Sequence, residues 1–137
     1  MQFSHFVGID ISKETLDAAL YPACDRKTDF LHFANSAKGL AEMMSWLKHR
    51  GVKPSDLLIC AEHTGIYTNT LIAFAHKKGI ALSLNSPLDI KRSIGLARGK
   101  NDTVDAARIA EFAYTRRDRL RLYERPAESI IKLQYLL

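Results

Sequence analysis

The chain has 137 residues, of which 47% are hydrophobic and 26% charged, and its 20 Lys and Arg outnumber its 15 Asp and Glu to give a net charge of +5. This length predicts one domain with a real hydrophobic core. With no apolar run of 18 residues, no leader-like N-terminus and two cysteines without metal-ligand spacing, the sequence predicts a cytoplasmic protein with reduced thiols, without a membrane span or signal peptide.

Three strand patterns come first along the chain. Residues 3–11 alternate between an apolar face and a face that includes Gly8 and Asp10. Residues 15–21 and 30–34 read as the second and third strands, and the connections between the three are short. The sequence therefore predicts an antiparallel meander.

The hydrophobic period then changes from strand-like to helical. Ser36 is a predicted N-cap for an amphipathic helix that ends at Gly51. Residues 57–61 form a short apolar run, typical of a buried strand, and Glu62 stands at its end. A turn at Gly65 follows this strand.

The second half of the chain predicts two more helices and one more strand. A helix over residues 67–78, closed by Gly79, leads into a fifth strand over residues 80–84. After an irregular stretch, a third helix runs from Asp102 to Thr115 and is followed by a charged loop. The order β-β-β-α-β-α-β-α predicts an α/β fold with a mixed five-stranded sheet flanked by helices.

Four acidic residues stand where a cation site would need them. Asp10 interrupts an apolar strand, where a charge is costly unless it is paired or bound to a metal, and Glu62 ends another strand. Asp102 and Asp105 are three residues apart, so they share one face of their helix. If the fourth strand lies beside the first, these carboxylates converge and could hold two Mg²⁺ or Mn²⁺ ions for phosphoryl transfer.

Each of these acids also has a purely structural interpretation. Asp10 could be an exposed edge residue or a paired core acid, and Glu62 a loop carboxylate at a strand end. Asp102 could be an N-cap, with Asp105 as the acidic residue of an approximate capping box.

The whole excess of positive charge lies in one segment. Residues 91–125 hold ten Lys and Arg against five Asp and Glu, while the rest of the chain holds ten of each. Such clustering is the electrostatic footprint of a nucleic-acid site. The predicted contacts to DNA are Lys91, Arg92, Arg98, Lys100, Arg108, Arg116 and Arg117.

Three motifs, in order, resemble the DEDD transposases of bacterial insertion sequences. They are Gly-Ile-Asp-Ile-Ser-Lys around Asp10, Glu-x-Thr-Gly-x-Tyr from Glu62, and Lys-Asn-Asp-x-x-Asp-Ala-x-x-Ile-Ala around Asp102 and Asp105. The family includes the Piv-type invertases and the bridge-RNA-guided recombinases. The resemblance implies an RNase H-like, RuvC-like fold, a metal-binding tetrad at these four acids, and DNA and a structured guide RNA as partners.

The resemblance also implies a division of the chain. Residues 1–122 correspond to the family's catalytic domain, and residues 123–137 to the start of a helical connector through which a homo-oligomer would form. Family members carry a further serine-bearing domain after this connector, so we expect this chain to be the N-terminal part of a transposase.

Two other functions remain open from the residues alone. One is an actin-like or sugar-kinase-type phosphotransferase, although Ser12-Lys13-Glu14 stands where those proteins have a glycine-rich phosphate turn. The other is a non-catalytic nucleic-acid-binding module in which the acids are caps and surface charges.

Overall fold

The computed structural model describes residues 3–22, 29–63, 65–86 and 102–123, with only the backbone described for 102–104. Within these residues the predicted order of elements is confirmed. The elements are β1 (His5–Ile11), β2 (Thr15–Tyr21), β3 (Phe30–Ala34), α1 (Ala37–His49), β4 (Leu57–Glu62), α2 (Asn69–Lys78), β5 (Ala81–Asn85) and α4 (Asp102–Thr115), with 3-10 turns η1 (Pro54–Asp56) and η2 (Gly65–Thr68).

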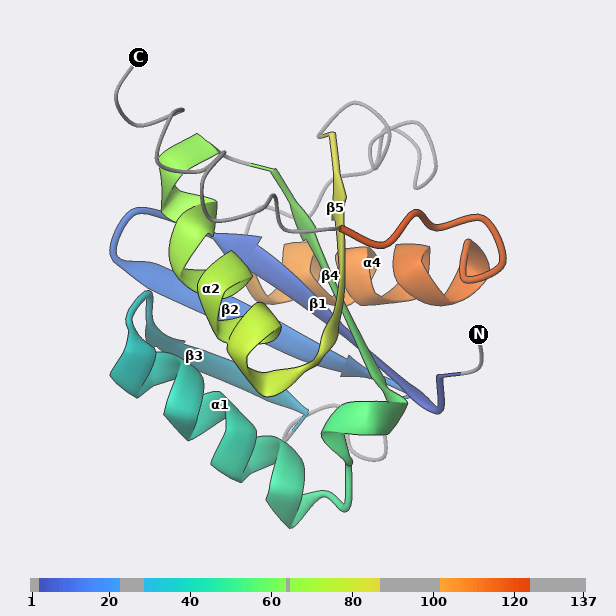
Figure 1. Cartoon of the computed structure of the whole chain (residues 1–137), viewed down its shortest axis with the longest axis horizontal. Coiled ribbons are helices and arrows are strands. Elements are labelled where there is room, and N and C mark those ends of the chain that lie inside the picture. Colours follow the sequence, from blue (N-terminus) through green and yellow to red (C-terminus); the bar gives the residue numbers. More distant parts are fainter. Residues whose placement is uncertain (1–2, 23–28, 64, 87–101, 124–137) are drawn as a thin grey trace.

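The sheet is mixed and has the order β3-β2-β1-β4-β5, with β1 in the centre (Figure 1). β1, β2 and β3 form the predicted antiparallel meander. β4 returns through α1 to pair with β1 in parallel, and β5 pairs with β4 in parallel. The carboxyl ends of β1, β4 and β5 therefore lie at one edge of the sheet.

Helices cover both faces of this sheet: α1 and α2 lie on one face and α4 lies on the other (Figure 1). Along β1, Val7 and Ile9 point into the larger core beneath α1 and α2. Phe6 points the other way, into a smaller core with Ile109 and Phe112 of α4. Alternation along each strand therefore decides which helix layer a side chain meets.

Gly8 is the point at which α4 touches the sheet most closely. A Cβ atom built on Gly8 would collide with the backbone of Ala106 and Ala110 in α4. Gly8 therefore permits a close approach to β1, and the approaching group is the helix backbone. Small residues on α4 complete the contact, since Ala106, Ala110 and Ala113 are all buried.

The helix ends follow the predicted signals, with one correction. The Ser36 side chain accepts a hydrogen bond from the Gly39 amide (3.1 Å) and caps α1, and Gly79 ends α2 in the left-handed conformation (φ 67°). The prediction that α2 begins at Tyr67 is wrong. Tyr67 lies in η2 and is 39% exposed, and α2 begins two residues later, at Asn69.

None of the helices in the described residues combines the length and the apolar character needed to cross a membrane.

Candidate nucleic-acid-processing site

A row of polar side chains crosses the sheet on the face that α4 covers. The register pairs Asp17 with His32 and Asp10 with Asp17, and it pairs Glu62 with Asn85. The last paired residues of β1 and β4 are Ile9 and Ala61, so Asp10 and Glu62 come next, side by side, on these two parallel strands. The row contains one residue from each strand: His32, Asp17, Asp10, Glu62 and Asn85.

Asp10 and Glu62 are neighbours at the carboxyl ends of two parallel strands. Both are half-buried. Their strand neighbours Phe6, Leu58 and Cys60 point into the α4 core, so alternation puts both carboxylates on the α4 face. Because β1 is the central strand, the interpretation of Asp10 as an exposed edge residue is excluded.

The direction of α4 brings the first turn of the helix to the carboxyl end of β1, where Asp10 lies. Tyr114, in the last turn, packs edge-on against Phe6 with ring centroids 5.6 Å apart, whereas Ala106 lies over Gly8. The helix thus runs in the opposite sense to β1. From this contact, Asp10 is about 7 Å further along the strand, and Asp102 is about 6 Å further along the helix axis.

The two aspartates of α4 differ in how much of them the structure describes. Asp105 is half-buried and immediately precedes the buried Ala106, while the Asp102 side chain lies outside the described residues. The His, Cys, Asp and Glu side chains that the structure describes contain no group of three able to hold a metal ion. The structure therefore brings Asp10 and Glu62 together on one face, and it orients the start of α4 toward them, without a complete ligand group among the described side chains.

The predicted basic contacts fall into three groups. Arg108, one turn after Asp105, is half-buried, and its Nη1 atom is buried without a hydrogen-bond partner among the described residues. Arg116 and Arg117 follow the other end of α4, where the Arg117 guanidinium stacks over Tyr114 at 4.2 Å. Lys91, Arg92, Arg98 and Lys100 lie outside the described residues.

Asn85 is the last residue of the row, beside Glu62, and it contacts Cys60, which precedes Glu62 on the same face of β4. The Asn85 side chain donates hydrogen bonds to Cys60 Sγ (3.4 Å) and Ser83 Oγ (3.1 Å). Burial raises the pKa of Cys60 to about 12 against the weaker opposing effect of the Asn85 hydrogen bond, and the nearby Glu62 charge raises it further. Cys60 is therefore a buried thiol that stays neutral near pH 7, which does not favour a role as a nucleophile.

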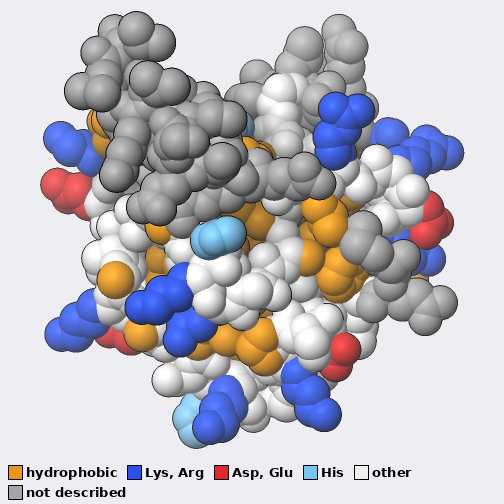
Figure 2. Space-filling model, viewed as in Figure 1, with side chains coloured by type: hydrophobic (Ala, Val, Ile, Leu, Met, Phe, Trp, Pro, Cys, Tyr) orange, Lys and Arg blue, Asp and Glu red, His pale blue; other side chains and the backbone are white. Residues whose placement is uncertain are grey.

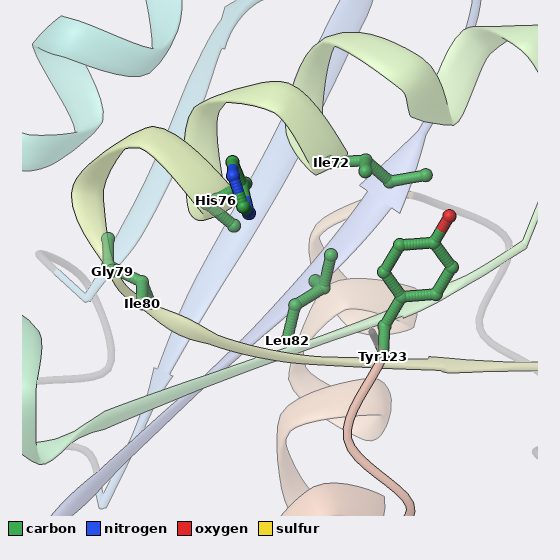
Figure 3. Close-up of a pocket in the computed structure, with 7 residues that line it drawn as sticks. Ile72, His76, Gly79, Ile80, Leu82 and Tyr123 are labelled. Atoms are coloured by element: carbon green, nitrogen blue, oxygen red, sulfur yellow. The ribbon is translucent and has the colours of Figure 1, made fainter. Parts of the chain in front are cut away.

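A pocket lies on the opposite face of the sheet from this row. Ile72, His76, Leu82 and Tyr123 converge between α2 and β5 (Figure 3), and the pocket has a volume of about 170 Å³. Its lining residues include no carboxylate. On the face seen in Figure 2, the acidic side chains of the described residues lie apart from one another.

Three members of the row, His32, Asp17 and Asn85, were missed by the sequence analysis. Asp17 is buried and His32 Nδ1 lies 2.7 Å from its Oδ1 atom. The signal that could have found Asp17 is the hairpin register: if Ile11 pairs with Leu16, then Asp17 must lie opposite Asp10. Position in the sequence alone marks Asp17 only as a polar residue on the alternating face of β2.

The donor set fits a hard divalent cation. Asp10, Glu62 and Asp105 offer only oxygen atoms, the ligands that Mg²⁺ and Mn²⁺ prefer over the nitrogen and sulfur donors of a zinc site. The parallel strand ends bring the first two together, and the third is fixed by the packing of the neighbouring Ala106. Among the described side chains these three do not by themselves form a metal-holding group, and Asp102, at the start of α4, is the fourth predicted ligand.

Comparisons with known proteins agree with this architecture. The model of a family described as "Transposase", the DEDD type of IS110, matches residues 7–137. Among solved structures, Thermus thermophilus RuvC is similar at 12% identity and a TM-score of 0.60 in its complex with a Holliday junction substrate, and at 13% identity and 0.55 in another structure. In both comparisons the matched region covers 87% of this chain and 99% of the RuvC chain. No curated protein matches the chain by sequence.

Proposed function

The chain belongs to the DEDD transposase family of the IS110 type, and we propose that it cuts and joins DNA with divalent cations held by Asp10, Glu62, Asp102 and Asp105. The fold is the RNase H-like fold of RuvC. The observation that supports the proposal most is the continuation of the β1–β4 register, which makes Asp10 and Glu62 adjacent on the face that α4 covers. Residues 1–122 are the proposed catalytic domain and residues 123–137 the proposed connector.

The four carboxylates would bind Mg²⁺ or Mn²⁺ and fix it against the sheet. When bound, the cations supply a water of lowered pKa and stabilise the charge that develops on the phosphate. Asp10 and Glu62 are held by strands on both sides, since β1 and β4 are interior strands. Asp105 is held through the contact of the Ala106 backbone with Gly8. Rigid support of this kind fixes carboxylates within the narrow tolerance that phosphoryl transfer needs.

Basic residues along α4 would bind the DNA backbone at two separate places. Arg108 lies one turn from Asp105, and its guanidinium, whose buried Nη1 atom has no hydrogen-bond partner within the described part of the chain, would bind a phosphate close to the reacting bond. Arg117 is 12 residues from Asp105, which corresponds to about 18 Å along a helix. At about 3.4 Å per nucleotide, Arg117 would contact a phosphate about five nucleotides away.

The other proposed partners follow from the family and from charge. A structured guide RNA would bind the same basic surface, and copies of the chain would associate through residues 123–137. The proposed location is the cytoplasm. The phosphotransferase alternative is disfavoured, because the family match covers most of the chain and Ser12-Lys13-Glu14 replaces a glycine-rich phosphate turn.

The test is a Mn²⁺ titration of the parent chain and of an Asp10→Asn variant by calorimetry and by Mn²⁺ electron paramagnetic resonance. The variant should fold like the parent and lose most of its Mn²⁺ affinity. Asp29→Asn is the control, because Asp29 is a buried acid bonded to Arg50 (3.1 Å) outside the row. Asp10→Asn binding Mn²⁺ as well as the parent would contradict the proposal.

A separate experiment tests the Arg108 assignment. An Arg108→Gln variant should bind a branched DNA duplex about tenfold more weakly in fluorescence anisotropy, the loss expected for a charged phosphate contact of about 1.4 kcal/mol. A Lys48→Gln variant, which removes a charge from α1 on the opposite face, serves as the control. Equal losses in both variants would show that net charge alone controls binding.

A further inference from the structure

Asp17 is a buried carboxylate directly opposite the proposed cation ligand Asp10. The antiparallel register pairs the two residues, and alternation puts both on the α4 face because their neighbours Leu16 and Ile9 point into the opposite core. The Asp17 side chain is 13% exposed. Like charges that lie directly opposite on neighbouring strands destabilise a sheet, so this pairing needs a reason other than stability.

Packing does not supply that reason. On the same face of β2, Ala19 and Tyr21 are the next residues, and Tyr21 packs against Tyr114 of α4. A small apolar residue at position 17 would continue this contact without the cost of a buried charge. The strand therefore keeps a carboxylate at the one position of its α4 face that pairs with Asp10.

His32 fixes the Asp17 carboxylate. Its Nδ1 atom lies 2.7 Å from Asp17 Oδ1, and its ring is 64% exposed. The pair is formed across β2 and β3, whose register puts the two residues opposite each other. One carboxylate oxygen is thus engaged by the outer strand, and the negative charge stays beside β1.

We propose that Asp17, held by His32, is a positioning residue for the cation site. The negative charge of Asp17 increases cation affinity and keeps the Asp10 carboxylate oriented away from β2, toward Glu62 and α4. This inference rests on the proposed function. Its physical basis is that a fixed negative charge one strand from the site stabilises a divalent cation but repels the neighbouring carboxylate. Asp17 itself is not proposed as a ligand.

The experiment compares Mn²⁺ affinity and melting temperature in the full chain. Asp17→Asn keeps a hydrogen-bonding group for His32 and removes the charge, so we expect about tenfold weaker Mn²⁺ binding with a melting temperature close to that of the parent. His32→Ala keeps the charge and loses the hydrogen bond, so we expect less than threefold weaker binding. Asp29→Asn, the buried acid paired with Arg50, should lower the melting temperature and leave Mn²⁺ affinity unchanged.

The outcomes separate this inference from the proposed function. If Asp10→Asn abolishes Mn²⁺ binding while Asp17→Asn binds like the parent, Asp17 has only a structural role and the inference fails alone. If His32→Ala weakens binding as much as Asp17→Asn, the hydrogen bond and not the charge matters, and the inference fails. If Asp10→Asn binds like the parent, or the parent does not bind Mn²⁺, the inference and the proposed function both fail.

Discussion

Replacing Gly8 by alanine would perturb the proposed site without altering any of its carboxylates. The new Cβ atom would meet the α4 backbone at Ala106, Ile109 and Ala110. None of these atoms belongs to a flexible side chain, so the strain can be relieved only by moving the helix or the central strand. Because Asp105 is next to Ala106, the movement is passed directly to the candidate ligands.

The size of the effect follows from the contact. The Cβ atom would lie 2.8 Å from the Ile109 carbonyl carbon, against 3.4 Å or more in ordinary contact. The Ala106 and Ala110 backbone atoms are closer still, so the helix must retreat by more than the difference of 0.6 Å. Overpacking of this kind costs about 1–3 kcal/mol. For a chain of this length, about 2 kcal/mol corresponds to a fall of roughly 6–10 °C in melting temperature.

The displacement also exceeds the positional tolerance of a metal or catalytic site, about 0.5 Å. We therefore expect Gly8→Ala to bind Mn²⁺ about tenfold more weakly than the parent at a temperature where both are folded. Calorimetry measures the affinity and circular dichroism the melting temperature.

Gly79→Ala is the matched control. Gly79 has φ 67° and open space around its Cβ position, so the substitution costs about 1 kcal/mol of backbone strain at the far end of α2. It should lower the melting temperature and leave Mn²⁺ affinity unchanged. A Gly8→Ala variant that melts and binds Mn²⁺ like the parent would refute the account of how α4 is positioned.

Three further predictions concern single elements. Burial raises the pKa of Cys60 from 9.0 to about 12, so a Cys24→Ser variant, in which Cys60 is the one remaining thiol, should resist thiol reagents until it unfolds. The unfolding free energy of this variant should fall by about 1.4 kcal/mol per pH unit between pH 9 and 12, because the thiol ionises first in the unfolded chain. Chemical denaturation of a Cys60→Ala variant should not show this dependence on pH. Ser36→Ala should lower the unfolding free energy by about 1 kcal/mol through loss of the α1 cap, whereas Ser36→Asp should retain it. Tyr114→Ala should cost about 2 kcal/mol by removing its edge contact with Phe6, and Tyr114→Phe should melt near the parent.

Most of the fold could be predicted because each element carries a local signal. The alternation of β1, the N-cap at Ser36 and the left-handed glycine at Gly79 each act within a few residues, and all three predictions are confirmed. The boundary of α2 could not be found in this way. Tyr67 fits the helical period, but the 3-10 turn over Gly65–Thr68 is fixed by a long-range contact, the hydrogen bond from the Asn35 side chain to the Tyr67 carbonyl oxygen (2.9 Å).

The candidate site shows the same division between local and long-range information. Asp10 and Glu62 are visible in the sequence because a charge inside or at the end of an apolar strand is unusual. Their adjacency, by contrast, depends on β4 pairing with β1, which is a property of the topology. Asp17 carries no local signal at all, because a polar residue on the alternating face of a strand is ordinary.

The mixed sheet explains why acids from such different places in the sequence reach one level. β1 and β4 are parallel, so Asp10 and Glu62 both come from strand ends. β2 runs the other way, so its residue at the same level, Asp17, comes from near a strand beginning. A search limited to the carboxyl ends of strands would therefore find Asp10 and Glu62 and miss Asp17, the neighbour that we propose sets their charge environment. In a central strand with one parallel and one antiparallel neighbour, the electrostatics of a site are decided by the register on both sides.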